Sequence, residues 1–378
     1  EATNQQDKQS GMTHDNISLT RVQASGLRHS FYRACGGDGR IDRRMICTKS
    51  GELATLTFGN RPMIEFDYLY KGLCGLANTH KVGALAGHLG AAVAAGYFFG
   101  EDQSDLPKGI YKGVEGELER VIRGEEAFWY NAKKAGVTPT ELFKPFPKEQ
   151  ANEDSTKTVA AALQKNVGKT RQSGHNIIFA TIALRALHDH AEYATPQIVA
   201  GVRKLVEGFN NAHPGRGYYG KAKGWLNGNQ VKLQPDNKFR PYKSIAQMVD
   251  VTIAELISTA AVRKQGFGGL WHLINHAAAI TELDRLGYEK VAAQALPAHH
   301  QHIRLWRSLP DVESELGSVV KSKPDPREPV YWEGMLKRDQ ARLTHRIKTL
   351  YGFYTIRRFV EDDATRKKAE DAFLNLMA

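Results

Sequence analysis

Four histidines lie where apolar helical segments begin, and a glycine or threonine stands shortly before each of them. They are His88, His175, His272 and His345. Imidazole is both a common metal ligand and a general acid or base near neutral pH, so a group of histidines suits either chemistry. The unequal intervals between the four argue against a strict solenoid and suit a barrel whose inner helices begin at one end. We therefore predict that these histidines, with His276 as an alternative to His272, converge on one cavity.

The start of the helix that follows Gly174 is the richest cluster of polar groups. It brings together Arg171, Gln172, His175 and Asn176. Free backbone N–H groups and the positive end of the helix dipole make such a start suitable for an anion. We take His175 and Asn176 as candidate catalytic residues, and Arg171 and Gln172 as candidate substrate-binding residues. Alternatively, Ser173 caps the helix and His175 is a core residue.

A second cluster contains two histidines at helical spacing. His272 and His276 are four residues apart and share a helix face, a spacing that can chelate zinc. A zincin-type metalloprotease is excluded because Leu273 stands where that motif needs glutamate. His276 is also a candidate catalytic residue, with Arg263 and Trp271 as substrate-binding candidates. The cofactor prediction is either none or zinc, and the other three histidines named above are the candidate further ligands.

Residues 212–243 form a basic, aromatic and glycine-rich segment. It carries seven lysines and arginines against the single acid Asp236. Cations and aromatic faces together suit an acidic sugar or another anionic ligand, although a solvated surface loop would have the same composition. Tyr218 and Tyr219 are candidates for a catalytic acid. The candidates for substrate binding are Arg216, Lys221, Lys223 and Trp225.

Two further groups of polar residues are expected to have structural or surface roles rather than catalytic ones. Glu125 and Glu126 are adjacent, so they point to different sides of a helix and do not form a catalytic pair; we expect one to be exposed and one to cap or bridge. The stretch from His299 to His302 is expected to be a polar surface face next to two arginines.

The overall composition restricts the class of partner. The chain has 378 residues and a net charge of +11, with 52 Lys and Arg against 41 Asp and Glu. Its mean hydropathy of −0.46 and its most apolar stretch, residues 82–99, which glycines and His88 interrupt, predict no membrane span. Nucleic acid is not an expected partner, because no recognised binding motif accompanies the basic segment.

Beyond residue 65 the pattern predicts helix after helix, so the expected fold is mostly α. A small β-hairpin is expected over Arg44–Gly59. The predicted domains are residues 1–60, a polar tail with the hairpin, and residues 61–378, a helical domain. Predicted helices include Gly116–Lys134, Tyr288–Leu296 and Arg338–Val360.

The cysteines and the first residues bear on localisation. Cys35 and Cys47 either form a disulfide in an oxidising compartment or remain thiols, and Cys74 is expected to be a buried thiol. The chain starts at Glu1 with a polar run, which fits a mature periplasmic or secreted protein whose leader was removed, although a trimmed chain would look the same.

Glycine-preceded polar starts on helices that are apolar nearly all round resemble those of the α/α-toroid enzymes, which include polysaccharide lyases and terpenoid cyclases. The clustered-acid signature of the cyclases is missing. The resemblance to the lyases implies that Asn176 and Arg171 neutralise a uronate carboxylate while His175 and a tyrosine move protons. The expected function is therefore an exported lyase that cleaves an acidic polysaccharide by β-elimination. The alternatives are a metal-dependent enzyme that uses the histidines on a small substrate, and a non-catalytic glycan-binding or scaffold protein.

Overall fold

The computed structural model describes residues 43–47, 53–57, 63–126, 129–236, 238–333 and 342–378. These residues belong to two compact units, one within residues 1–59 and one within residues 60–378. In the first unit, β1 (Arg43–Cys47) pairs antiparallel with β2 (Leu53–Thr57), with Arg43 opposite Thr57. The turn predicted between them lies outside the described residues, as does Cys35.

The second unit is mostly helical, as the apolar periodicity predicts. Its longer helices are α1 (Asp67–Asn78), α2 (Gly87–Asp102), α3 (Lys108–Ile122), α6 (Lys157–Gln164), α7 (His175–Asp189), α8 (Pro196–Glu207), α9 (Ile245–Thr259), α10 (Gly269–Arg285), α11 (Glu289–Arg307), α14 (Leu343–Arg357) and α15 (Asp363–Phe373). The shorter elements are α4 (Ala132–Ala135), α5 (Pro139–Leu142), α12 (Glu313–Leu316), α13 (Pro329–Trp332), and the antiparallel strands β3 (Arg216–Tyr218) and β4 (Trp225–Asn227). Among the described residues, no helix is both long and apolar enough to cross a bilayer.

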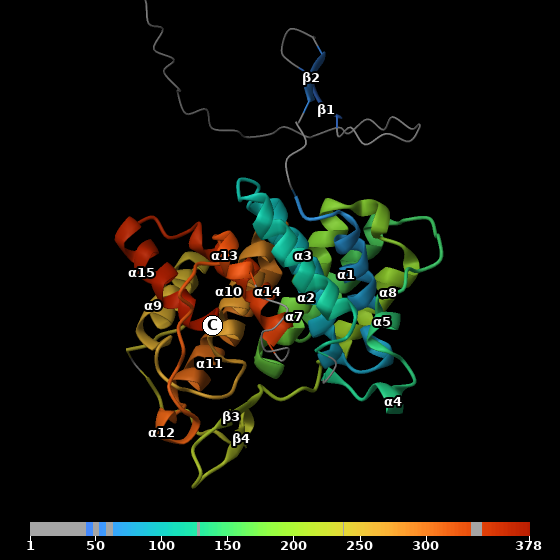
Figure 1. Ribbon diagram of the computed structural model, residues 1–378. Coiled ribbons are helices and arrows are strands. Elements are labelled where there is room, and N and C mark those ends of the chain that lie inside the picture. Colours follow the sequence, from blue (N-terminus) through green and yellow to red (C-terminus); the bar gives the residue numbers. More distant parts are fainter. Residues whose placement is uncertain (1–42, 48–52, 58–62, 127–128, 237, 334–341) are drawn as a thin grey trace, which may run out of the picture. The chain divides into compact units, whose positions relative to one another are not determined.

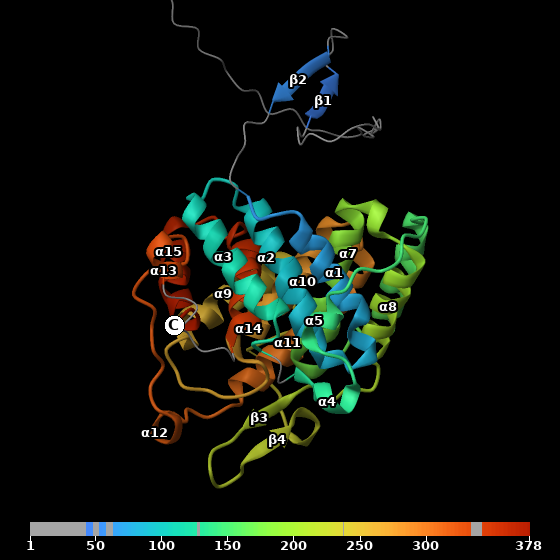
Figure 2. The same cartoon turned by 45° about the vertical axis from the view of Figure 1, so that its right-hand side comes forward.

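Four helices occupy the middle of this unit. Helix α2 contacts α7, α7 contacts α10, α10 contacts α14, and α14 contacts α2, so the four close a ring (Figures 1 and 2). Each is buried over most of its length. Apolar and small residues cover most faces of α2, α7 and α10, whereas α14 also buries Lys348 and Arg346, which pairs with Glu117. Small residues also bring neighbouring helices close: a Cβ on Gly90 of α2 would lie 2.3 Å from the backbone nitrogen of Leu76 in α1.

The four central helices run in the same direction. Near their C-terminal ends, Arg185 of α7 contacts Asp102 Oδ1 at 2.7 Å, Tyr351 Oη at 3.2 Å and Glu282 Oε2 at 3.6 Å, which joins α7 to α2, α14 and α10. Their N-terminal turns meet at the opposite end of the ring. This arrangement places the first residues of four helices around one point.

Two predicted helix boundaries are wrong. The predicted helix Gly116–Lys134 is replaced by α3, which ends at Ile122, because Gly124 adopts a φ of 83° close to Pro139. The helix predicted over Tyr288–Leu296 instead continues through Pro297 to Arg307. Packing against the rest of the unit overrides a residue that usually interrupts a helix.

Candidate metal centre

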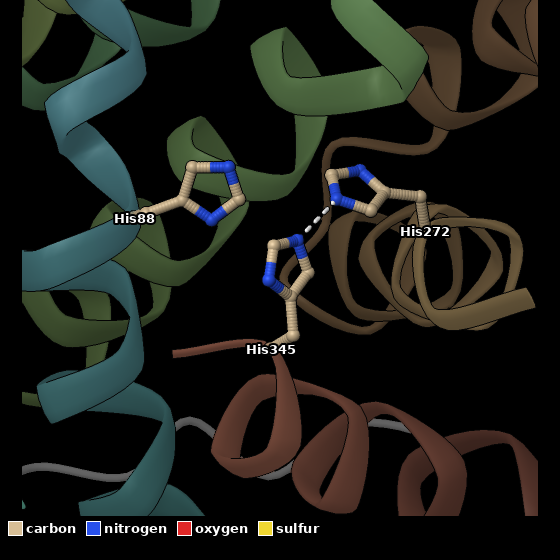
Figure 3. A group of neighbouring side chains, drawn as sticks. All are labelled: His88, His272 and His345. Carbon is tan, nitrogen blue, oxygen red and sulfur yellow. Dashed lines mark hydrogen bonds between the residues drawn. The ribbon is translucent and has the colours of Figure 1, made fainter. Parts of the chain in front are cut away.

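Three histidines from three of the central helices form a compact group. His88, His272 and His345 lie in the first turns of α2, α10 and α14, and each offers a ring nitrogen within 4.8 Å of the others (Figure 3). His272 Nε2 is 2.9 Å from His345 Nε2. His88 and His272 are buried, and His345 is half-buried. Imidazoles gathered in this way are a suitable donor set for a transition metal.

His175, the first residue of α7, completes the ring of histidines. Its Nε2 lies 2.7 Å from His88 Nε2, and its ring meets that of His272 edge-on with centroids 4.5 Å apart. The structure therefore brings together four histidines that the sequence places at four helix starts. This follows from the parallel direction of the helices, since antiparallel neighbours would have separated them.

A strained turn orients His272. Gln172, Ser173 and Gly174 all have positive φ angles, of 44°, 60° and 85°. The turn is held by hydrogen bonds from Gln172 N to the His213 carbonyl (2.7 Å) and from Ser173 N to the Pro214 carbonyl (2.8 Å). It directs the Ser173 carbonyl at His272 Nδ1, at 3.1 Å. Because a carbonyl only accepts, His272 Nδ1 carries the proton, and Nε2 presents its lone pair to the histidine group.

The glycine loop before α10 allows this ring to pack close to the backbone. A Cβ on Gly268, whose φ is 72°, would lie 2.2 Å from His272 Cγ. A Cβ on Gly266, whose φ is 122°, would lie 2.4 Å from the Gly217 Cα, and these two glycines form an isolated β-bridge. The absence of a side chain therefore lets Gly268 pack against the His272 ring and lets Gly266 pack against β3.

Two buried ionisable groups flank the histidines. Lys348 Nζ shares a hydrogen bond with His88 Nδ1. Glu126 accepts a hydrogen bond from the backbone nitrogen of Thr344, at the start of α14, at 2.5 Å. Burial lowers the pKa of Lys348 and raises that of Glu126, and the attraction between the two opposes both shifts. One carboxylate of this acidic pair caps a helix, as expected, but neither is exposed: Glu125 is half-buried and bridges to Arg120 and Arg123.

The four imidazoles are held in their neutral form. Burial is the main cause that lowers the pKa of His272 to about 3 and those of His88, His175 and His345 well below the usual value, and the nearby Lys348 charge lowers them further. Neutral rings retain the lone pairs that metal binding requires. The same shift makes His175 less suited to act as a base near neutral pH.

A cavity of about 610 Å³ opens beside His345. Four of the five tryptophans in the chain line it: Trp129, Trp225, Trp271 and Trp306. Four cations line it as well: Arg216, Arg263, Lys264 and Arg342. Among the described lining residues there is no aspartate or glutamate. The cavity therefore combines aromatic walls with positive charge, next to the histidine group.

Two of these tryptophans stack on the histidines. The Trp129 and His88 ring centroids are 3.7 Å apart with an interplanar angle of 13°, and those of Trp271 and His345 are 5.3 Å apart at 30°. The guanidinium of Arg342 lies over the indole of Trp271, 5.7 Å from the ring centroid. The indoles thus connect the cavity walls to the candidate metal ligands.

Part of the predicted substrate-binding set lines this cavity, namely Arg216, Trp225, Arg263 and Trp271. Lys221 and Lys223 are exposed and do not line it. Tyr218 donates a hydrogen bond to Glu315 at 2.7 Å, and Tyr219 shares one with Ser308 at 2.6 Å. Neither tyrosine is among the lining residues.

The groups predicted to bind a carboxylate at the start of α7 each have a partner within the protein, although Arg171 Nε, like Arg263 Nε, has none among the described residues. Arg171 Nη1 donates to the Ala212 carbonyl at 2.8 Å, and Asn176 Nδ2 donates to Asn166 Oδ1 at 2.9 Å. Gln172 Nε2 lies 3.2 Å from His213 Nε2. Arg171 and Gln172 thus tie the turn that orients His272 to residues 212–213, whereas Asn176 joins α7 to Asn166. None of the three lines the cavity.

His276 belongs to a separate histidine group. Its Nδ1 is 3.2 Å from His302 Nδ1, so His272 and His276 do not share a ligand site despite their spacing. The surface position expected for His299 and His302 is wrong, since both are fully buried. Their Nε2 atoms bond to the carbonyls of Leu273 and Phe267 at 3.1 and 2.7 Å, which satisfies these rings inside the core.

Sequence reasoning missed several residues of the site. Lys348 follows His345 by three residues and so shares its helix face, and a lysine in a helix that is apolar nearly all round was an available signal. Trp129 and Arg342 carry no local signal of a site: Trp129 lies between α3 and α4, and Arg342 is the N-cap of α14. Cys74 is buried as expected, and burial raises the pKa of its thiol to about 11.

Comparison with known proteins finds no family model, no curated protein and no solved structure that matches this chain.

Proposed function

We propose that this protein is a metal-dependent enzyme that holds a divalent transition metal, such as zinc, through His88, His272 and His345 and acts on an anionic substrate in the adjoining cavity. The observation that carries the proposal is a group of three neutral imidazoles beside a basic, aromatic cavity. Three protein ligands with room for a further one are typical of catalytic zinc sites.

The surroundings of the three rings fit a metal. A metal 2.0–2.1 Å from each nitrogen needs nitrogens about 3–4 Å apart, and small ring rotations supply this from the present separations, which are all within 4.8 Å. The bond from His272 Nδ1 to the Ser173 carbonyl is the outer contact that metal-binding histidines usually make. When bound, the metal would act as a Lewis acid that polarises the substrate or activates water.

The chain's own residues supply the rest of the site. Four helix N-termini and the cations of the cavity favour negative charge near His345. Arg263 and Arg216 attract and orient the anion, and the indoles of Trp129 and Trp271 exclude water from its other side. For His88 Nε2 to bind the metal, His88 Nδ1 must carry the proton, so the hydrogen bond with Lys348 requires a neutral amine that accepts it, and burial of Lys348 favours that form.

We also propose the α/α-toroid class for the helical unit, which the ring of four parallel central helices supports. Cleavage of an acidic polysaccharide by β-elimination has less support, because Arg171 and Asn176 are engaged within the protein and the tyrosines lie outside the cavity lining. Ultraviolet absorbance of an unsaturated product during incubation with uronate polymers tests that alternative.

Metal titration tests the main proposal. Protein freed of metal with a chelator is titrated with ZnCl₂ in a calorimeter, and one equivalent is expected to bind. His345→Ala and His272→Ala are expected to weaken binding by at least about 100-fold, whereas His188→Ala, on the surface, and His299→Gln, in the separate group, retain it. Folded protein that binds no zinc, cobalt or nickel stoichiometrically would overturn the proposal.

A further inference from the structure

The walls of the cavity are more aromatic than an anion alone requires. Trp129 and Trp271 both lie close to His345, with ring centroids 5.4 and 5.3 Å from its ring. Trp306 adds a third indole to the lining. Aromatic side chains bury large flat surfaces and prefer offset stacking with another ring. Such walls favour a ligand that presents a flat apolar face.

Two cations, Arg263 and Lys264, line the same cavity as these indoles. Arg263 Nε is buried and has no hydrogen-bond partner among the described residues. Lys264 Nζ lies 5.3 Å from the centre of the Trp306 ring and donates long hydrogen bonds to the carbonyls of Trp306 and Arg307, at 3.4 and 3.5 Å. Burial lowers its pKa. A buried guanidinium nitrogen without a partner is costly, and a carboxylate from a ligand would satisfy it. The charge of the ligand would thus lie close to an indole.

The polar groups of the lining argue against a sugar. A sugar ring carries many hydroxyls, and each buried hydroxyl needs a hydrogen-bond partner. Besides His345 and the indole N–H groups, the uncharged polar side chains among the described lining residues are those of Thr259, Gln265, Ser318 and Asn375, and no carboxylate is present to accept from hydroxyls. An aromatic ring has no such need.

We infer that the ligand of this cavity is an aromatic carboxylate of two or three fused rings, whose carboxylate meets Arg263 and whose ring stacks on Trp271 and Trp129. The cavity volume of about 610 Å³ lies within the range of sites for ligands of that size. As a statement about the substrate, the inference rests on the proposed function; as a statement about binding, it does not need the metal. It replaces the acidic sugar expected from the sequence with a flat aromatic acid.

Binding of naphthalene-2-carboxylate, followed by calorimetry and by quenching of tryptophan fluorescence, tests this inference. The comparison ligands are naphthalene-2-carboxamide, which lacks the charge, and D-glucuronate, which lacks the aromatic face. We expect the naphthoate to bind at least about tenfold more tightly than either, and raised salt to weaken it. Equal or tighter binding of glucuronate overturns the inference, and so does equal binding of the neutral amide.

Variants locate the ligand. Arg263→Gln and Trp271→Leu are each expected to weaken naphthoate binding by about tenfold or more, and circular dichroism checks that each variant is folded. Lys221→Ala removes an exposed cation outside the cavity lining and is expected to leave binding unchanged. Loss of binding in Trp225→Ala alone would place the ligand on the exposed indole of Trp225 and overturn the inference.

The test separates the inference from the proposed function, because each titration is made on chelator-treated and on zinc-loaded protein. Naphthoate binding without any zinc binding would leave the inference standing and refute the metal-dependent function. Zinc binding without naphthoate binding would refute the inference about the ligand and leave the metal-dependent function standing.

Discussion

Ser173 and His272 are 99 residues apart, yet the Ser173 carbonyl oxygen accepts a hydrogen bond from His272 Nδ1 at 3.1 Å. This contact selects the tautomer of His272 and turns its Nε2 toward His345. It depends on a turn of three residues with positive φ angles, a conformation that L-residues seldom adopt. Strain of this kind persists where the surrounding structure over-determines it and often accompanies a functional site.

The glycine loop allows a matched test of this close packing. Gly268 and Gly269 both have positive φ angles, of 72° and 65°, but only a Cβ at Gly268 would meet the His272 ring. Gly269→Ala is expected to lower the free energy of unfolding by about 1 kcal/mol through backbone strain alone. Gly268→Ala is expected to cost about 1–3 kcal/mol more, because the ring must move. Urea denaturation measures both, and equal losses would show that the ring contact is unimportant.

Zinc is expected to stabilise the folded protein, because the ligands come from three helices that only the folded chain brings together. At a free zinc concentration 1,000 times the Kd, linkage predicts a gain of about 4 kcal/mol. Thermal denaturation of chelator-treated protein, with and without zinc, measures the shift in Tm. His88→Ala is expected to abolish the shift while His299→Gln keeps it. An equal shift in both variants would assign the zinc to another site.

The second histidine group predicts a loss of stability in acid. Burial lowers the pKa of His302 from 6.5 to about 4, so the unfolded chain takes up this proton at a higher pH than the folded one. The contribution of His302 to the free energy of unfolding is therefore constant above about pH 6.5. As the pH falls toward 4, protonation of this ring in the unfolded chain lowers the free energy of unfolding by up to about 3 kcal/mol. Other groups titrate in the same range, so the comparison with variants isolates this ring.

Urea denaturation between pH 7.5 and 4 measures the slope for wild type and His302→Gln. The variant is expected to be less stable at pH 7.5, because Gln keeps only part of the bonding to Phe267, and to lose less stability on acidification. His188→Gln alters an exposed ring and serves as the control. An unchanged slope in His302→Gln would contradict the assignment.

Glu126 and Lys348 are expected to be energetically coupled. Each is buried, and the charge of each shifts the pKa of the other. Lys348→Met and Glu126→Gln are each expected to destabilise the fold by about 2–4 kcal/mol, because either leaves a buried partner uncompensated. The double variant is expected to lose less than the sum, by about 1–3 kcal/mol. Strict additivity in a double-mutant cycle would show that the two groups do not interact.

Local patterns in the chain carry much of the architecture. Apolar residues on all faces of the segments around Ala92, Ala180, Ala278 and Leu350 predict buried helices, and these are the central helices α2, α7, α10 and α14. Histidines at their starts predict a shared site. Helical periodicity and burial depend on residues a few positions apart, which is why the sequence alone reveals them.

The tertiary structure decided which groups each of these histidines contacts. The i, i+4 spacing of His272 and His276 suggests a shared ion, but the first ring faces His345 and the second faces His302. His299 has the polar character of a surface residue, yet the carbonyl of Leu273 satisfies it within the core. Spacing along a helix sets which residues share a face, whereas the direction of a ring depends on acceptors that distant segments supply. For His272 that acceptor lies in the turn before another helix, and no local pattern records it.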